Sequence, residues 1–182
     1  MSSLDPLVEL LSRRSVRTGN FVLSSGRHST YYIDARLTTM SAEGLRLIGR
    51  RGLEAIRSAG WAPSAVGGLT MGADPVAYAI ATASLDAPPV VDAFSVRKEA
   101  KGHGTKRRIE GNFSPGMKVV VIEDVITTGG SAVQAIEAVR AEGGDIAGVL
   151  AVVDREEGGK AAIEALQVQV VSLTTTTALG LK

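Results

Sequence analysis

The chain contains no cysteine and no apolar run long enough to span a membrane, and its charges almost balance. Without cysteine there can be no disulfide, no thiolate metal site and no cysteine nucleophile, a composition that suits a reducing cytoplasm. A formal net charge of +1 argues against a general nucleic-acid binder. Residues 1–14 mix charges with leucines at helical spacing, which predicts an amphipathic helix rather than a signal peptide. We therefore expect a cytoplasmic protein that binds neither nucleic acid nor a membrane.

The length of 182 residues suits one domain, since a chain of this size buries roughly 70% of its unfolded surface. Strand-like apolar runs alternate with helical patterns, most regularly after Trp61, which predicts βαβ units in an α/β domain. The threonine run 174–177 is expected to be an exposed final strand or tail. The expected strands are 65–68, 90–96, 118–123, 145–153 and 168–173, and the expected helices are 41–59, 75–84, 131–141 and 160–165.

The most informative stretch is residues 119–131, in which a β-branched apolar run ends in two acids and then in a glycine turn rich in hydroxyls. Such a run is typical of a buried parallel strand, and open α/β sheets bind ligands at the carboxyl ends of these strands. Glu123 and Asp124 can accept hydrogen bonds from vicinal hydroxyls there. The turn 127–131 offers N–H groups and hydroxyls at a helix start, where phosphate is favoured. The order predicts a site for a phosphorylated sugar.

Two commoner nucleotide motifs do not fit this stretch. A Walker loop needs a lysine after its glycines, and none follows Gly129 and Gly130. A dinucleotide fingerprint has a different glycine spacing and no acid pair ahead of it. An ordinary acidic turn would explain the glycines, but it gives no reason for acids at an apolar strand end, where an unpaired buried carboxylate is costly.

The same stretch resembles the phosphoribosyl diphosphate (PRPP) signature of type I phosphoribosyltransferases. The resemblance implies a Rossmann-like open, mainly parallel sheet flanked by helices, with a small N-terminal hood. It also implies that Glu123 and Asp124 hold the ribose hydroxyls. The residues implied to hold the 5′-phosphate are Thr127, Thr128, Gly129, Gly130 and Ser131.

A second motif is the basic segment 97–108, in which lysines and arginines surround Gly102 and Gly104. Flexible glycines and positive charge suit a lid that closes over a polyanion such as diphosphate, although a solvated basic loop has the same composition. His103 lies between the two glycines. Its reference pKa of about 6.5 would let it arrive protonated on a departing phosphate oxygen.

Three segments narrow the resemblance to orotate phosphoribosyltransferases. They are the basic segment followed by Ile-Glu-Gly, the stretch 21–34 (FVLSSGRHSTYYID) and the strand end 152–155 (VVDR). By this resemblance the catalytic residues are Arg97, Lys98, Lys101 and His103. The residues implied to contact orotate are Arg155, Thr127, Tyr31 and Tyr32.

Arg155 and the tyrosines also have simpler interpretations. A guanidinium fork suits the carboxylate of orotate, but Arg155 could equally form a surface salt bridge with Glu156 or Glu157. Adjacent aromatics on a strand point to opposite faces, so at most one of Tyr31 and Tyr32 is expected to touch the base.

The glycine turn 67–75 (GGLTMGADP) resembles the family's pyrophosphate loop, which assigns Thr70, Met71 and Gly72 to PRPP. Taken alone, Asp74 and Pro75 are only a helix start. The chain departs from the family at Ser24, where many members have a lysine that reaches toward the substrates. Arg27 or His28 could replace that charge, or both could be ordinary turn residues.

The resemblance implies transfer of the 5-phosphoribosyl group from PRPP to orotate, in pyrimidine biosynthesis, by a single domain 1–182. Residues 1–38 and part of the C-terminus would form the hood over the base, and 39–173 the core. Mg²⁺ would be held mainly by PRPP and water, without side-chain ligands. A homodimer would share loop 99–105 between subunits. The alternatives are a purine phosphoribosyltransferase and a PRPP-sensing regulator.

Overall fold

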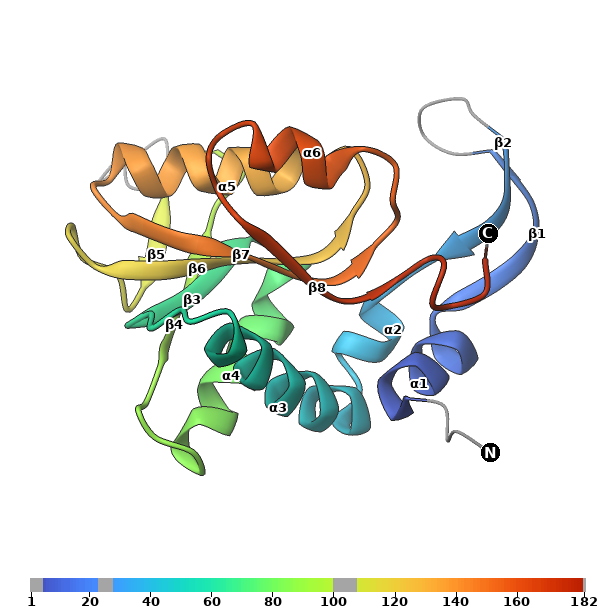
Figure 1. Ribbon diagram of the computed structural model, residues 1–182, viewed down its shortest axis with the longest axis horizontal. Coiled ribbons are helices and arrows are strands. Elements are labelled where there is room, and N and C mark those ends of the chain that lie inside the picture. Colours follow the sequence, from blue (N-terminus) through green and yellow to red (C-terminus); the bar gives the residue numbers. More distant parts are fainter. Residues whose placement is uncertain (1–4, 23–27, 100–107, 182) are drawn as a thin grey trace.

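The chain forms a six-stranded sheet with helices on both faces and a separate two-stranded sheet near its N-terminus (Figure 1). A computed structural model describes residues 5–22, 28–99 and 108–181. The large sheet has the order β5-β4-β3-β6-β7-β8, and only β5 runs antiparallel to its neighbour. Its strands are β3 (Ala65–Leu69), β4 (Asp92–Val96), β5 (Ile109–Gly111), β6 (Lys118–Ile126), β7 (Asp145–Asp154) and β8 (Val170–Thr175).

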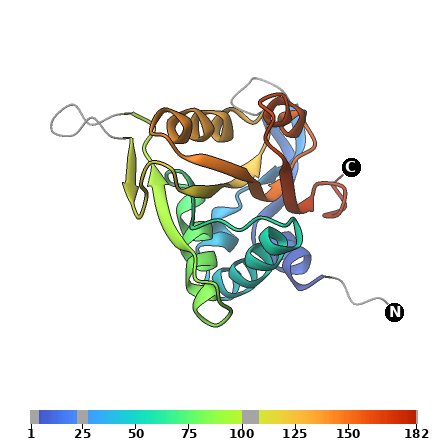
Figure 2. The same cartoon turned by 60° about the vertical axis from the view of Figure 1, so that its left-hand side comes forward.

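The mainly parallel sheet confirms the expected α/β fold. β6 lies at its centre, and successive strands are added to either side of the β3–β6 pair. Ligands of open α/β sheets collect at such a reversal of strand order, beyond the carboxyl ends of the strands. Helices of both layers are seen above and below the sheet in Figure 2. The helices of the domain are α1 (Pro6–Arg14), α2 (Arg36–Thr39), α3 (Ala42–Ser58), α4 (Ala73–Leu85), α5 (Gly130–Ala141) and α6 (Gly159–Glu164).

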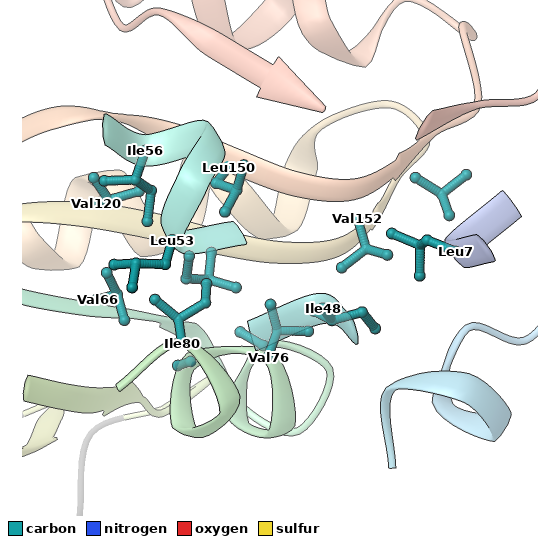
Figure 3. Packing of buried hydrophobic residues seen from close by; sticks show 14 of the residues in the cluster. Leu7, Ile48, Leu53, Ile56, Val66, Val76, Ile80, Val120, Leu150 and Val152 are labelled. Atoms are coloured by element: carbon teal, nitrogen blue, oxygen red, sulfur yellow. The ribbon is translucent and has the colours of Figure 1, made fainter. Parts of the chain in front are cut away.

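Strand β6 is apolar on both faces because each face meets a different helical layer. Val120 and Ile122 pack in the core cluster that α1, α3 and α4 cover, and Figure 3 shows the packing around Val120. Val119 and Val121 lie in the second cluster, under α5 and α6. All four side chains are fully buried. The two cores therefore fix the direction of β6 and the place where it ends.

The N-terminal segment forms the antiparallel pair β1 (Val16–Val22) and β2 (His28–Ile33), which stands at one end of the large sheet (Figure 1). Helix α1 begins where the Asp5 carboxylate accepts a hydrogen bond from the Leu7 N–H at 2.9 Å, an N-cap that stabilises the first turn. No helix in the described ranges is long and apolar enough to cross a membrane.

The threonine run 174–177 ends the final strand, as expected, but the expectation that the run is exposed was wrong except at Thr177. Strand β8 continues to Thr175, and the side chains of Thr174 and Thr176 are buried. The Thr176 N–H donates to the Asp154 carbonyl at 3.0 Å, which keeps the chain beside β7 after β8 has ended. Strand β6 also extends past Glu123 to Ile126, so that the acid pair lies inside the strand, near its carboxyl end.

Gly148 on β7 offers a test of this packing. A Cβ at Gly148 would overlap the ring of Trp61, a buried residue. We expect Gly148→Ala to lower the free energy of unfolding by about 1 to 3 kcal/mol, because overpacking forces core side chains out of their preferred rotamers. Urea denaturation followed by circular dichroism measures this loss. The same substitution should cost less in a Trp61→Leu background, and an equal cost in both backgrounds would refute the proposed overlap.

Candidate active site

The acid pair lies at the carboxyl end of β6. Glu123 is 7% exposed, and Asp124 is half-buried. One Asp124 carboxylate oxygen accepts a hydrogen bond from the Val125 N–H at 2.8 Å. Burial raises the pKa of Glu123 to about 8, and the neighbouring negative charge of Asp124 adds to the shift. Near neutral pH the Glu123 carboxyl group therefore keeps its proton, so the pair offers both a donor and acceptors to a diol.

The loop after β6 turns sharply into α5. Gly129 has φ 85°, and the helix begins at the next residue. The Gly159 N–H donates to the Thr127 carbonyl at 3.0 Å. A Cβ at Gly129 would lie 2.8 Å from the Gly159 carbonyl oxygen, so a glycine is required for this approach. Thr128, Gly130 and Ser131 are exposed at the helix start, where backbone N–H groups favour an anion.

The segment 70–72 meets the acid pair from β3. A Cβ at Gly72 would lie 2.8 Å from the Asp124 carboxylate, so only glycine allows this contact. The Thr70 N–H donates to the Val96 carbonyl at 2.8 Å, and the Thr70–Met71 peptide bond is cis. Met71 itself is exposed. The loop assigned to diphosphate therefore lies directly against one of the acids assigned to ribose.

Asp74 has a larger part in this loop than its sequence position indicated. Its carboxylate accepts hydrogen bonds from the Thr70 hydroxyl at 2.6 Å and from the Ser95 hydroxyl at 2.7 Å. Ser95 also lies 3.0 Å from the Tyr78 hydroxyl. Asp74, in the first turn of α4, thus connects Thr70 of the loop with Ser95 of β4. The sequence presented it as a helix start, and no local pattern pointed to Ser95.

Arg155 is buried directly after β7, beside the end of β6. It is 7% exposed, and its N–H donates to the Ile126 carbonyl at 2.9 Å. Its guanidinium Nη2 lies 2.8 Å from Glu157 Oε1, and its Cζ lies 5.1 Å from the centre of the Tyr31 ring. The Nε atom has no hydrogen-bond partner among the described residues. Glu157 is thus one partner of Arg155, and one buried N–H of its fork is left for an acceptor.

The two adjacent tyrosines point in different directions, as strand alternation predicts. Tyr31 is half-buried against Arg155. Tyr32 is 40% exposed and packs on Phe21, with ring centres 5.8 Å apart. Only Tyr31 therefore joins the small sheet to Arg155.

The basic segment is described only at its ends. Lys101 and His103 lie outside the described residues, as do Ser24 and Arg27. Arg97 pairs with Glu110 at 3.0 Å in a half-exposed contact between β4 and β5. Lys98 is exposed just beyond β4, and His28 is exposed on β2.

Arg36 is a cation near the acid pair that the sequence analysis missed. Its Nε and Nη2 donate to the two Asp34 carboxylate oxygens at 2.8 and 3.0 Å. The hydrogen bond with Asp34 is the main cause that raises the Arg36 pKa, and the negative charges of Asp34 and Asp124 raise it further. The only local signal was an Asp-x-Arg sequence directly after β2.

The described residues contain no group of three or more His, Asp or Glu side chains placed to hold a metal ion. The Asp124 carboxylate lies against Gly72, in the segment that the family resemblance assigns to diphosphate. Any Mg²⁺ at this edge would need further oxygen ligands from substrate or water, which is the coordination that Mg²⁺ commonly adopts.

Comparison with known proteins gives a consistent result. The phosphoribosyl transferase domain family matches residues 42–176. The orotate phosphoribosyltransferase of Aquifex aeolicus (strain VF5) is 48% identical over 167 residues, which cover 90% of each chain. The crystal structure of Mycobacterium tuberculosis H37Rv orotate phosphoribosyltransferase with Fe(III) dicitrate has a TM-score of 0.86 at 47% identity, and the match covers 96% of this chain and 97% of that one.

A second crystal structure of the Mycobacterium tuberculosis H37Rv enzyme is a complex with PRPP. It has a TM-score of 0.81 at 44% identity, and the match again covers 96% of this chain and 97% of the other. These similarities extend over nearly the whole chain, in sequence as well as in fold. The chain belongs to the orotate phosphoribosyltransferase family, within the phosphoribosyl transferase domain family.

Proposed function

We propose that this chain transfers the 5-phosphoribosyl group from PRPP to orotate, giving orotidine 5′-phosphate and diphosphate for pyrimidine biosynthesis. The observation that carries the proposal is the meeting of three elements at one edge of the sheet. Asp124 lies against Gly72, and Arg155 is bonded through its N–H to Ile126 at the end of the same strand. Ribose, diphosphate and base sites are thus adjacent. The names of the relatives support the same reaction.

PRPP lies across the carboxyl ends of β3 and β6 in this proposal. Glu123 and Asp124 hold the 2′ and 3′ hydroxyls, because a protonated and a charged carboxyl group together supply a donor and acceptors. Residues 127–131 hold the 5′-phosphate through N–H groups and hydroxyls at the start of α5. The N–H groups of Met71 and Gly72 face the diphosphate, since the Thr70 N–H is bonded to the Val96 carbonyl. The anomeric carbon then lies between the two loops.

The reaction is a displacement at the anomeric carbon. A ring nitrogen of orotate forms the new C–N bond and gives up its proton to solvent as the C–O bond to diphosphate breaks, and the electrons of the C–O bond leave with diphosphate. The transition state has oxocarbenium character, so catalysis comes from positioning and from cations placed near the leaving oxygens. We assign that role to Arg97, Lys98, Lys101 and His103. No enzyme nucleophile is needed.

Mg²⁺ completes the proposed site. An ion bound with PRPP would supply positive charge for the leaving diphosphate. Two carboxylates lie beside the 70–72 loop, Asp124 against Gly72 and Asp74 on the Thr70 hydroxyl, but the ligands of the ion would come mainly from PRPP and water. The residues present therefore fit a metal that arrives with its substrate. A cytoplasmic location agrees with the absence of cysteine.

Orotate lies under the N-terminal hood, which β1 and β2 provide together with part of the C-terminus. Arg155 binds its carboxylate, Thr127 faces the pyrimidine, and Tyr31 covers one side of the guanidinium. Burial strengthens such a contact because water is excluded from the charged pair. Tyr32 packs on Phe21 instead, so we assign base contact to Tyr31 alone.

The base test uses wild-type protein and an Arg155→Leu variant. Wild-type protein should consume PRPP with orotate and not with adenine. Arg155→Leu should raise KM for orotate about ten- to a hundredfold, because a charge-assisted contact contributes about 1.5 to 3 kcal/mol. KM for PRPP should change little. Steady-state rates with each substrate varied in turn measure both constants.

Arg140→Leu is the matched control for this variant, since Arg140 lies at the end of α5 and bonds the Leu166 carbonyl away from the site. Both KM values should remain near those of wild type. Consumption of PRPP with adenine, or an equal rise of both KM values in Arg155→Leu, would contradict the assignment.

The proposed assembly is a homodimer in which loop 99–105 of each subunit serves the partner's site. Lys101→Ala and Asp124→Asn should each be nearly inactive alone. After subunit exchange, a mixed dimer has one site with both defects and one site intact. Activity should recover to as much as about one quarter of wild type, because half of the dimers are mixed and each has one good site. Rate measurements before and after mixing test this.

The exchange itself must be verified by mass spectrometry of differently labelled subunits. A mixture of Lys101→Ala with itself is the control, and it should stay inactive. Verified exchange without recovery would show that the loop acts in its own subunit or has no catalytic part.

A further inference from the structure

The residue after Arg155 adopts a backbone conformation that few side chains favour. Glu156 has φ 55°, in the left-handed region that usually belongs to glycine. Its N–H donates to Asp154 Oδ1 at 2.7 Å. Non-glycine residues hold such a conformation only where the surrounding structure fixes it. Contacts of the Glu156 side chain provide that constraint.

The Glu156 carboxylate is held by the threonine run at the C-terminal end of β8. Its Oε2 accepts hydrogen bonds from the Thr176 hydroxyl at 2.7 Å and from the Thr177 N–H and hydroxyl, both at 2.8 Å. The Thr177 hydroxyl also lies 3.0 Å from Oε1. We call Glu156, Thr176 and Thr177 the threonine clamp. The sequence analysis assigned no functional role to these threonines.

The clamp also reaches the backbone of Arg155. The Thr176 hydroxyl lies 3.1 Å from the Arg155 carbonyl oxygen, and the Thr176 N–H donates to the Asp154 carbonyl at 3.0 Å. On its other side the Arg155 N–H is bonded to the Ile126 carbonyl at 2.9 Å. The backbone of Arg155 is therefore fixed between β6 and the C-terminal segment.

This constraint fixes the backbone from which the Arg155 side chain extends, and contacts with Glu157 and Tyr31 hold its guanidinium group. A bidentate contact needs a planar fork in one orientation, and a side chain whose backbone is already fixed loses less freedom on binding. The left-handed turn at Glu156 also brings Glu157 back to Arg155, where its carboxylate lies 2.8 Å from Nη2. Tyr31 packs against the same guanidinium.

We propose that the threonine clamp is a positioning device that sets Arg155 for a carboxylate-bearing pyrimidine, and so contributes to base selection without touching substrate. This inference rests on the proposed function, because it takes the ligand of Arg155 to be the orotate carboxylate. It assigns a role to Glu156, Thr176 and Thr177 that differs from those of the PRPP-binding residues.

The test compares Thr177→Val with Thr177→Ser. Thr177 is exposed, so neither change should disturb the core. The valine variant loses the hydroxyl that bonds Glu156, and we expect KM for orotate to rise about three- to tenfold. This is less than the effect of losing a charge-assisted contact to substrate, because Thr177 acts on orotate only through Glu156 and Arg155. KM for PRPP and Tm should stay at their wild-type values. The serine variant keeps the hydroxyl and should restore KM for orotate.

Glu156→Gly and Gln167→Gly form a matched pair. Gln167 has φ 60° and lies before β8, at the amino end of that strand, whereas Glu156 lies at the carboxyl end of the neighbouring strand β7. Both changes remove a side chain from a left-handed position, but only Glu156→Gly should raise KM for orotate. In an Arg155→Leu background, Thr177→Val should cause no further rise, because the group that it positions is absent.

Several outcomes overturn the inference. They are an unchanged KM for orotate in Thr177→Val and Glu156→Gly, equal rises of both KM values, or the same rise in Gln167→Gly. Full additivity with Arg155→Leu would also overturn it. Failure of wild-type protein to couple orotate with PRPP would instead refute the proposed function, so the two failures can be told apart.

Discussion

The site depends on a carboxyl group that is held out of water at the end of a fully buried strand. Glu123 is 7% exposed, and burial raises its pKa to about 8. An ionised carboxylate there would be costly to desolvate, whereas a protonated one beside the charged Asp124 can bond a diol. The strand below it is apolar on both faces, so polar chemistry is confined to its carboxyl end. Because the two helical layers bury the rest of β6, only its carboxyl end is left for a polar substrate.

Other elements reach that same edge because the sheet is parallel. Strand β3 brings the 70–72 loop against Asp124 through Gly72, and β7 brings Arg155 to Ile126. Their positions depend on close backbone approaches and on buried hydrogen bonds, such as those that Asp74 accepts. Such contacts hold loops in place before any ligand binds, which lowers the entropy lost on binding. Preorganisation of this kind suits a reaction that relies on positioning rather than on covalent catalysis.

Sequence analysis could predict the features that depend on the order of neighbouring residues, such as strands and the faces to which their side chains point. The apolar run ending at Glu123 predicted a central strand, and alternation correctly separated Tyr31 from Tyr32. Contacts between segments that are far apart in the sequence could not be predicted from such local patterns. The run 174–177 was expected to be exposed because threonines suit an edge strand, yet the hydroxyls of Thr176 and Thr177 bond Glu156, about twenty residues away. Arg155 had two interpretations, and the structure shows the Glu157 pair while leaving the buried Nε available, so neither interpretation excludes the other.

The most direct test of the account is PRPP binding by the acid pair, measured by isothermal titration calorimetry in the presence of Mg²⁺. Asp124→Asn keeps the shape of the side chain and removes its charge. Asp145→Asn is the control, because Asp145 is exposed at the opposite end of the neighbouring strand β7. The account predicts that Asp124→Asn binds PRPP about tenfold or more weakly, the effect of losing a charged hydrogen-bond acceptor. Asp145→Asn should bind like wild type. Equal PRPP affinity for folded Asp124→Asn and wild-type protein would contradict the account.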